Sequence, residues 1–158
     1  MDTESRRMLA HLIRTQRIAT LGTLREGAPF VSMVLFAPSP DFSTFSIHIS
    51  RLAHHTRNIL GDPRVSLMIA GTDTGTQDPL TLARVSIQGV AVEVPLTGSE
   101  YEEIKSAYLI KHPHATFNFQ LGDLSLFGIR VSMARYVAGF GKIFDLTVED
   151  FISSSLEK

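Results

Sequence analysis

The polar residues with the clearest chemical potential gather in one short stretch, where a predicted strand gives way to a predicted helix. Ser50 ends an alternating segment, and His54, His55, Thr56 and Arg57 follow it closely. Hydroxyl, imidazole and guanidinium groups bind phosphate oxygens, and a helix N-terminus adds unpaired backbone N–H groups and the positive end of its dipole. The stretch therefore predicts a phosphate site. The same residues also fit a plain helix start, where Ser and Thr satisfy local backbone groups.

The histidines do not indicate a resident metal. A helix presents two ligands on one face at i, i+4 spacing, whereas His54 and His55 are adjacent. The chain has no cysteine, which excludes thiolate metal sites and disulfides. The remaining histidines are scattered and predict surface or structural positions: His11, His48, His112 and His114. Ser50 beside two histidines is no hydrolase constellation because nothing marks an oxyanion hole. We expect no metal site, and catalysis, if present, to come from an organic cofactor.

The composition is that of an ordinary soluble chain. It has 158 residues, of which 44% are hydrophobic and 20% charged, and these predict one domain over residues 1–158. The formal charge of −1 argues against a nucleic-acid or anionic-membrane partner. No apolar run approaches the ~20 residues that span a bilayer. The N-terminus carries acidic residues where a secretory peptide has an apolar core, so we expect a cytoplasmic protein.

Apolar periodicity predicts short strands with helices at the start, middle and late third of the chain. The expected helices are 4–15, 54–60, 99–111 and 147–152, with Ser99 and Glu102 forming a capping box on the third. The expected strands are 18–24, 28–36, 44–49, 65–69, 84–94, 124–130 and 133–137. The last two strands pair with each other, and Gly89 marks a bend or bulge. The polar segment Gly71–Pro79 fits either a flexible flap or a partner-facing loop. These elements predict an α+β fold: a small antiparallel β-barrel of six or seven strands with flanking helices.

The order of these elements, and the residues in them, resemble the FMN-binding split β-barrel of pyridoxamine 5′-phosphate oxidase-like proteins. The likeness is closest to the haem-utilisation branch. The segments that carry it are Ile18–Leu21, Gly27–Ser32, Ile49–Asn58, Asp62–Leu67, Asp78–Leu80, Leu82–Arg84, Gly122–Leu124 and Gly139–Gly141. Haem-degrading members carry a proximal histidine in a C-terminal extension, and this sequence ends at Lys158 without one.

The resemblance implies a homodimer with FMN at the subunit interface. Ser32, Met33 and Val34 would lie along the isoalloxazine ring, although Ser32 also fits a hydrogen-bonded sheet position and Met33 core or interface filling. The implied phosphate ligands are Ser50, His55 and Thr56, supported by His54, Arg57 and Asn58. Arg84 would contact the flavin or face solvent. Phe140 and Lys142 would cover the flavin or form part of a tight turn.

Two departures from the oxidase narrow the expected function. His54 and His55 stand where the oxidase has an Arg/Lys-rich phosphate segment, so we expect phosphate binding to weaken as the pH rises through the histidine pKa. The residues that bind the oxidase's substrate phosphate have no counterpart, so we do not expect pyridoxamine phosphate oxidation. The expected function is an FMN-dependent oxidoreductase acting on a small-molecule substrate or reduced donor, with its catalytic residues unidentified. The alternatives are a haem-binding or haem-degrading dimer on the same barrel, and a flavin-binding module without turnover.

Overall fold

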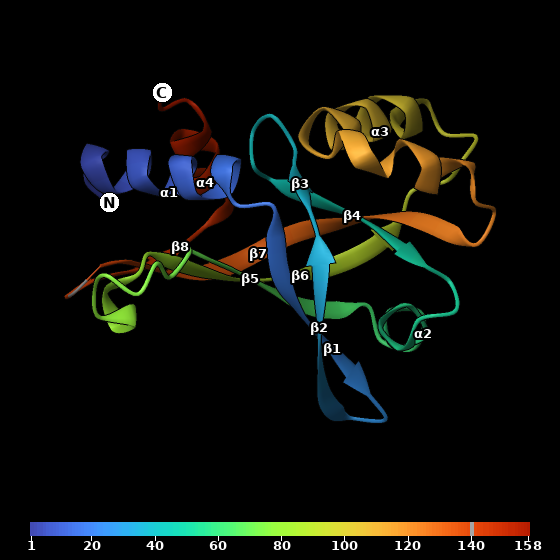
Figure 1. The fold of residues 1–158 in the computed structure, drawn as a ribbon, viewed down its shortest axis with the longest axis horizontal. Helices are drawn as coiled ribbons and strands as arrows, with labels where there is room; N and C mark the ends of the chain where they lie inside the picture. The colour runs from blue at the N-terminus through green and yellow to red at the C-terminus, as the bar shows by residue number, and fades with distance from the viewer. Residues whose placement is uncertain (140) are drawn as a thin grey trace.

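The computed structural model of the protein describes residues 1–139 and 141–158, so the expectation for Phe140 lies outside the described residues. One curled antiparallel sheet is flanked by helices, which confirms the predicted fold class (Figure 1). The strands are β1 (Ile18–Arg25), β2 (Ala28–Leu35), β3 (Ala37–Pro38), β4 (Thr44–Ser50), β5 (Arg64–Ala70), β6 (Arg84–Glu93), β7 (Leu124–Gly139) and β8 (Lys142–Leu146). The helices are α1 (Thr3–Thr15), α2 (His54–Gly61), α3 (Ser99–Lys111) and α4 (Val148–Ser155), with 3₁₀ turns η1 (Pro79–Thr81) and η2 (Pro113–Gln120).

The strands follow the order β2-β1-β5-β6-β7-β4-β3, and β8 also pairs with β7. Strand β7 runs unbroken through 16 residues, so the expectation that 124–130 and 133–137 pair with each other is wrong. Its partners explain why it stays extended. β6 runs along one side of most of it, while β4 covers the other side of its first half and β8 that of its second half.

The core lies on the concave side of the sheet, where alternate residues of neighbouring strands point inward. One cross-strand row is buried throughout: Leu21, Leu67, Ile87, Ala134 and Leu146. Helices α1 and α4 cover one end of this half-barrel, and α3 with η2 covers the other (Figure 1). From α4, the fully buried Phe151 meets Phe45 edge-on, with 6.1 Å between ring centroids. Burying an aromatic side chain of this kind contributes roughly 1.5–3 kcal/mol.

Gly89 lies at the predicted irregularity, because the β6–β7 register shifts between Gln88 and Gly89. A Cβ atom at position 89 would lie 2.3 Å from the Arg130 carbonyl oxygen. Only glycine allows the two backbones to approach this closely.

The start of α3 differs from the expectation. Gly98 is its N-cap and makes no side-chain cap bond, so the predicted Ser99–Glu102 capping box is wrong. Ser99 is already the first helical residue, and its hydroxyl is therefore not at the capping position. A capping box does form at α4, between Thr147 and Asp150. Within the described residues, no helix has the length and apolar character that a membrane span requires.

Candidate functional site

The predicted phosphate stretch forms a compact junction between β4 and α2. Thr56 is fully buried, and its Oγ1 donates to the Ser50 carbonyl oxygen at 2.6 Å. The Ser50 hydroxyl accepts from the Leu52 amide at 3.2 Å and donates to Asp123 Oδ2 at 3.4 Å. Asn58 Nδ2 donates to Thr23 Oγ1 at 2.9 Å in a buried contact that fixes α2 against β1. Thr56 and Asn58 are thus committed to protein partners.

The remaining side chains of this junction are more accessible. His54 is exposed, with its ring centroid 6.0 Å from that of Phe30 on β2. His55 is half-buried, and its desolvation, aided by the neighbouring His54, lowers its pKa, which favours the neutral imidazole. Arg57 Nη2 donates to the Leu52 carbonyl oxygen at 2.9 Å. His54, Arg57 and Asn58 line a polar hollow of about 550 Å³ between α2 and the β1–β2 hairpin.

The three residues predicted along the flavin ring lie on β2, which pairs only with β1 among the described strands. Val34 is buried, whereas the Met33 side chain is 70% exposed. The Ser32 hydroxyl is buried and has no hydrogen-bond partner among the described residues. A buried hydroxyl without a partner is costly, so this atom is a candidate ligand contact.

Arg84 and Lys142 lie away from the α2 junction. Arg84 begins β6 and pairs with Ala70 at the far end of β5, whereas α2 leads into the near end of that strand. The Arg84 guanidinium donates to the carbonyl oxygens of Leu80 and Leu82, both at 3.1 Å. Lys142 pairs with Glu4 of α1 at 3.5 Å. The structure therefore brings the junction residues together with β2 but separates them from these two cations.

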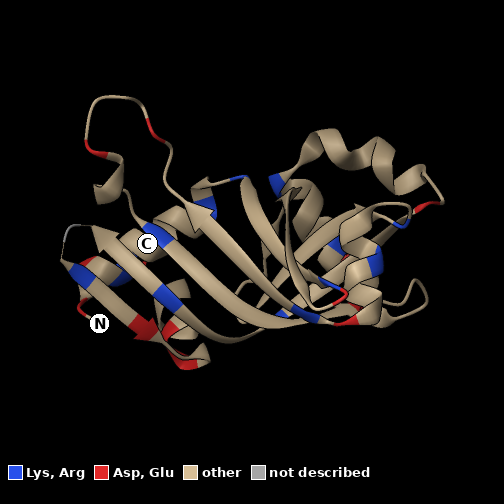
Figure 2. Ribbon diagram, turned by 90° about the horizontal axis from the view of Figure 1, so that it is seen from below, with Lys and Arg blue, Asp and Glu red and all other residues tan. Residues whose placement is uncertain are grey.

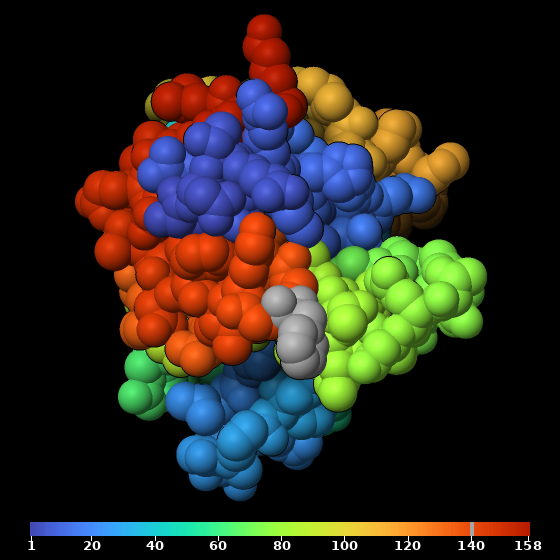
Figure 3. Space-filling view, turned by 90° about the vertical axis from the view of Figure 1, so that its left-hand side faces the viewer, coloured from blue at the N-terminus to red at the C-terminus, as the bar shows by residue number. Residues whose placement is uncertain are grey.

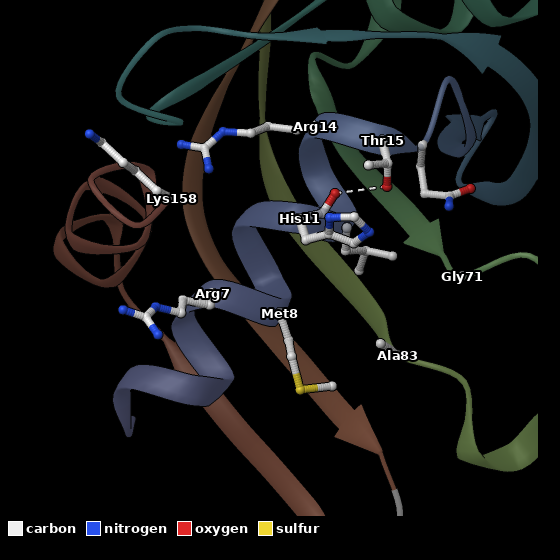
Figure 4. A pocket seen from close by; sticks show the side chains of 10 residues that line it. Arg7, Met8, His11, Arg14, Thr15, Gly71, Ala83 and Lys158 are labelled. Atoms are coloured by element: carbon white, nitrogen blue, oxygen red, sulfur yellow. Dashed lines mark hydrogen bonds between the residues drawn. The ribbon is translucent and has the colours of Figure 1, made fainter.

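Another hollow, of about 670 Å³, lies against α1 (Figure 4). Met8 and Leu12 of α1, with Ala83 before β6, provide apolar lining, and His11 lies among them. The cationic lining residues are Arg7, Arg14 and Lys158. The sequence did not lead us to expect this hollow, and His11 was interpreted as a surface or structural residue. The sequence pattern that could have indicated it is a pair of adjacent stripes along the helix, each at i, i+4, i+7 spacing: Arg7, His11 and Arg14 beside Met8, Leu12 and Thr15.

Comparison with known proteins identifies haem-related relatives. The chain is 37% identical over 129 residues to the chloroplastic heme oxygenase HOZ of Arabidopsis thaliana, a match that covers 80% of this chain and 37% of that protein. It is 24% identical over 140 residues to the heme oxygenase HutZ of Vibrio cholerae, covering 88% of this chain and 77% of HutZ. The chain thus spans little more than a third of the plant relative's length.

Solved structures agree on the fold. A heme-binding protein from Mycobacterium smegmatis superimposes with a TM-score of 0.84 at 29% identity, covering 94% of this chain and 60% of the other. A protein of the pyridoxinephosphate oxidase family from Clostridium acetobutylicum superimposes with a TM-score of 0.70 over 96% and 99% of the two chains. At 12% identity, the second match supports the fold alone. The sequence also matches the family described as CREG, beta-barrel, over residues 2–153, and the chain belongs to this family of split barrels.

Proposed function

We propose that this protein binds haem as a split-barrel dimer and acts in haem degradation. The observation that carries the proposal is the state of the β4–α2 junction. Of the three phosphate ligands that an FMN site would use, Thr56 is fully buried and its hydroxyl is bonded to the Ser50 carbonyl oxygen. Asn58, one of the three supporting residues, also donates to a protein atom, whereas Arg57 gives one N–H to the Leu52 carbonyl oxygen and keeps its other donors. The Thr56 hydroxyl and the Asn58 amide are therefore not free to donate to a phosphate dianion.

The relatives support the same ligand. The plant and Vibrio proteins are named heme oxygenases, and the mycobacterial structure is named a heme-binding protein. Haem, when bound, supplies an iron centre at which oxygen chemistry takes place. The protein's part is to bind the macrocycle, orient it and limit the access of water.

The FMN-dependent oxidoreductase expected from the sequence is the second candidate. One observation favours it: the buried Ser32 hydroxyl on β2 has no partner in the described part of the chain, and it lies where the resemblance places the flavin ring. Flavin, when bound, would supply hydride or electron transfer. Ser32 would then donate to a polar atom of the ring, which would satisfy its hydroxyl.

The proposed dimer interface is the convex face of the sheet. Side chains that point away from the core leave an apolar surface over neighbouring strands: Ile18 is 51% exposed, Val31 62%, Met33 70%, Met68 38% and Met133 51%. The register places Met33 beside Thr20 and Thr20 beside Met68, so this surface is continuous across β2, β1 and β5. A contiguous apolar surface of this kind is typical of an interface, and a second copy of the chain is the proposed partner.

A competition experiment tests the choice of ligand. The purified protein is mixed with equal concentrations of haemin and FMN, passed through a desalting column, and examined by absorbance. Haem retention with little flavin supports the proposal, whereas retention of flavin alone supports the oxidoreductase.

Turnover is tested separately by adding a reductant and oxygen to the haem complex. Loss of the main haem absorption band, with formation of a linear tetrapyrrole, is the expected result.

A further inference from the structure

Helix α3 and the turn η2 form a separate unit of the fold, residues 95–121, which we call the α3–η2 cover. It lies at the end of the molecule away from both chain termini (Figure 2). Among the described residues, the main hydrophobic core contains no member of the cover. Its buried residues Tyr108 and Ala115 form a small second core with Ala37 of β3. Such sparse apolar contact is typical of a unit that opens locally while the rest of the chain stays folded.

Both connections of the cover begin at strands that are already paired. β6 and β7 are neighbours, and their pairing extends to Glu93 opposite Phe127. Just beyond this pair, the Val94 amide donates to the Leu126 carbonyl oxygen at 2.8 Å. The cover can therefore rotate about the segments before α3 and after η2 without breaking the strand pairing of the barrel. Opening of this kind is a hinge motion.

Two neighbouring side chains hold the C-terminal end of α3. Lys111 Nζ donates to the Ile13 carbonyl oxygen in α1 at 2.7 Å, and it lies 4.0 Å from the centre of the Phe36 ring. His112 Nε2 lies 2.7 Å from the Phe36 carbonyl oxygen. Because a carbonyl oxygen only accepts, Nε2 carries the proton of the neutral imidazole. The cover is thus tied to α1, and Figure 3 shows its gold and orange atoms beside the blue atoms at the end of that helix.

A second proton on the His112 ring would be placed at a buried atom. Nδ1 is buried and has no hydrogen-bond partner in the described part of the chain. The charged groups that act on this ring are both cations: Lys111 beside it and Arg17 between α1 and β1. The Tyr108 ring lies 4.9 Å away, and burial raises its pKa to about 12, so it is neutral. Burial of His112, with these two cations, lowers its pKa and keeps the imidazole neutral.

His48 lies beneath the other half of the cover, on the face of β4 that points away from the main core. Its ring stacks on that of Phe119 from η2, with centroids 3.8 Å apart, and Tyr108 meets it edge-on at 6.1 Å. Lys105 Nζ lies 5.8 Å from the centre of the Phe119 ring and pairs with Glu102 at 3.4 Å. Burial lowers the pKa of His48 to about 4, so this ring is also neutral beneath the closed cover.

The cover is therefore held at two neutral imidazoles, and each gains a proton more readily once the cover has opened. We propose that the α3–η2 cover is released by acid, with protonation of His48 and His112 favouring an open state in which the barrel remains folded. Opening exposes the outer side of β3 and β4 and makes both imidazoles accessible to solvent. The inference goes beyond the proposed ligand and does not depend on it.

The direction of the pH effect follows from linkage. In the open state both imidazoles are solvated and titrate near their ordinary value of about 6.5, so this state binds more protons than the closed one below that pH. Opening is therefore favoured as the pH falls. For His48 alone, the population of the open state rises roughly thirtyfold between about pH 7.5 and about pH 5, and His112 adds to this increase. Burial lowers the pKa of Lys111 only to about 8, so this residue contributes little to the change.

The test is amide hydrogen exchange of the full chain by mass spectrometry, at about pH 7.5 and about pH 5, with intrinsic exchange rates corrected for pH. At about pH 7.5, amides of α3 and η2 exchange through an opening that is more frequent, and less dependent on low urea concentrations, than that of β5 and β6. Opening of the cover increases at least roughly thirtyfold at about pH 5. An opening shared with β5 and β6 overturns the separate cover, and a separate opening that is equal at both pH values overturns its release by acid.

Three variants assign the pH effect to residues. His48→Phe still stacks on Phe119 but cannot titrate, so the pH response of the cover falls to the share of His112. His112→Gln keeps an amide donor for the Phe36 carbonyl oxygen and removes the other share. His114→Gln is the matched control, because it removes an exposed histidine of η2, and it keeps the wild-type response.

An equal loss of pH response in His114→Gln and His48→Phe overturns the assignment to the buried pair. Circular dichroism at about pH 7.5 shows whether each variant is folded. If His112→Gln is not folded, the difference between His48→Phe and His114→Gln decides the assignment.

Discussion

Replacing Thr56 with valine separates a structural role of this residue from a phosphate-binding one. Valine keeps the shape of the side chain and removes only the hydroxyl, which donates to the Ser50 carbonyl oxygen at 2.6 Å from a fully buried position. We expect the main effect to be on stability, because this bond closes the turn between β4 and α2.

The expected loss lies at the lower end of the range for buried hydrogen bonds. Removing one partner of such a bond costs about 1–3 kcal/mol when the other is left without a partner. The Ser50 carbonyl oxygen also accepts from the Ala53 amide at 3.2 Å, so it is not left entirely unsatisfied. We therefore expect the free energy of unfolding to fall by about 1–2 kcal/mol, which corresponds to a decrease of roughly 2–8 °C in melting temperature for a chain of this size. Urea and thermal unfolding, followed by circular dichroism at one fixed protein concentration, measure this loss.

Thr116→Val is the matched control. Its hydroxyl also donates to a nearby backbone oxygen, that of Pro113 at 2.8 Å, but this bond is exposed. The expected change is within about 0.5 kcal/mol. Unchanged stability of Thr56→Val together with weakened FMN binding would refute the structural role, because that result assigns the hydroxyl to a phosphate.

Three further predictions follow from packing, exposure and titration. Gly89→Ala should lower the free energy of unfolding by about 1–3 kcal/mol, as measured by urea titration, because the new Cβ atom would lie 2.3 Å from the Arg130 carbonyl oxygen. Wild-type stability of this variant would contradict the close approach of the two backbones. Met33→Glu and Met68→Glu should shift the protein from dimer to monomer in light scattering, because each would bury an unpaired charge at the proposed interface. Ile110→Glu is the control, because this residue of α3 is 80% exposed, and it should not change the oligomeric state. Dimers in all three variants would place the interface elsewhere. Burial lowers the pKa of His48 from 6.5 to about 4, so the unfolded chain takes up a proton that the folded chain does not, and stability falls as pH drops through that window. His48→Phe can still stack on Phe119 but cannot titrate, so it should lose less stability than the wild type between about pH 7 and pH 5, as measured by urea midpoints; equal losses would contradict this role.

Much of the fold follows from local pattern. Alternation along the strands and the turn at Gly27, with φ 81°, are properties of short segments, and the structure agrees with them closely. The break expected near Val131 does not occur, because the continuity of β7 depends on β6, β4 and β8. No short window of sequence contains those partners.

The candidate site was harder to predict for the same reason. The resemblance directs attention to Ser50 and Thr56, whose types suit a phosphate, but burial and the bond between them emerge only from the folded junction. His11 has polar and apolar neighbours at helical spacing, which in sequence resembles an ordinary amphipathic helix. The hollow exists because the distant segments around Gly71 and Ala83 lie beside that helix.

The measurement that tests haem binding most directly is a titration of the wild-type chain with haemin, monitored by absorbance, with FMN titrated in parallel by fluorescence. We predict saturable binding of one haem per chain and weak or no binding of FMN. Tight, saturable binding of FMN without binding of haem would contradict this prediction, and would return the function to the flavin site on β2.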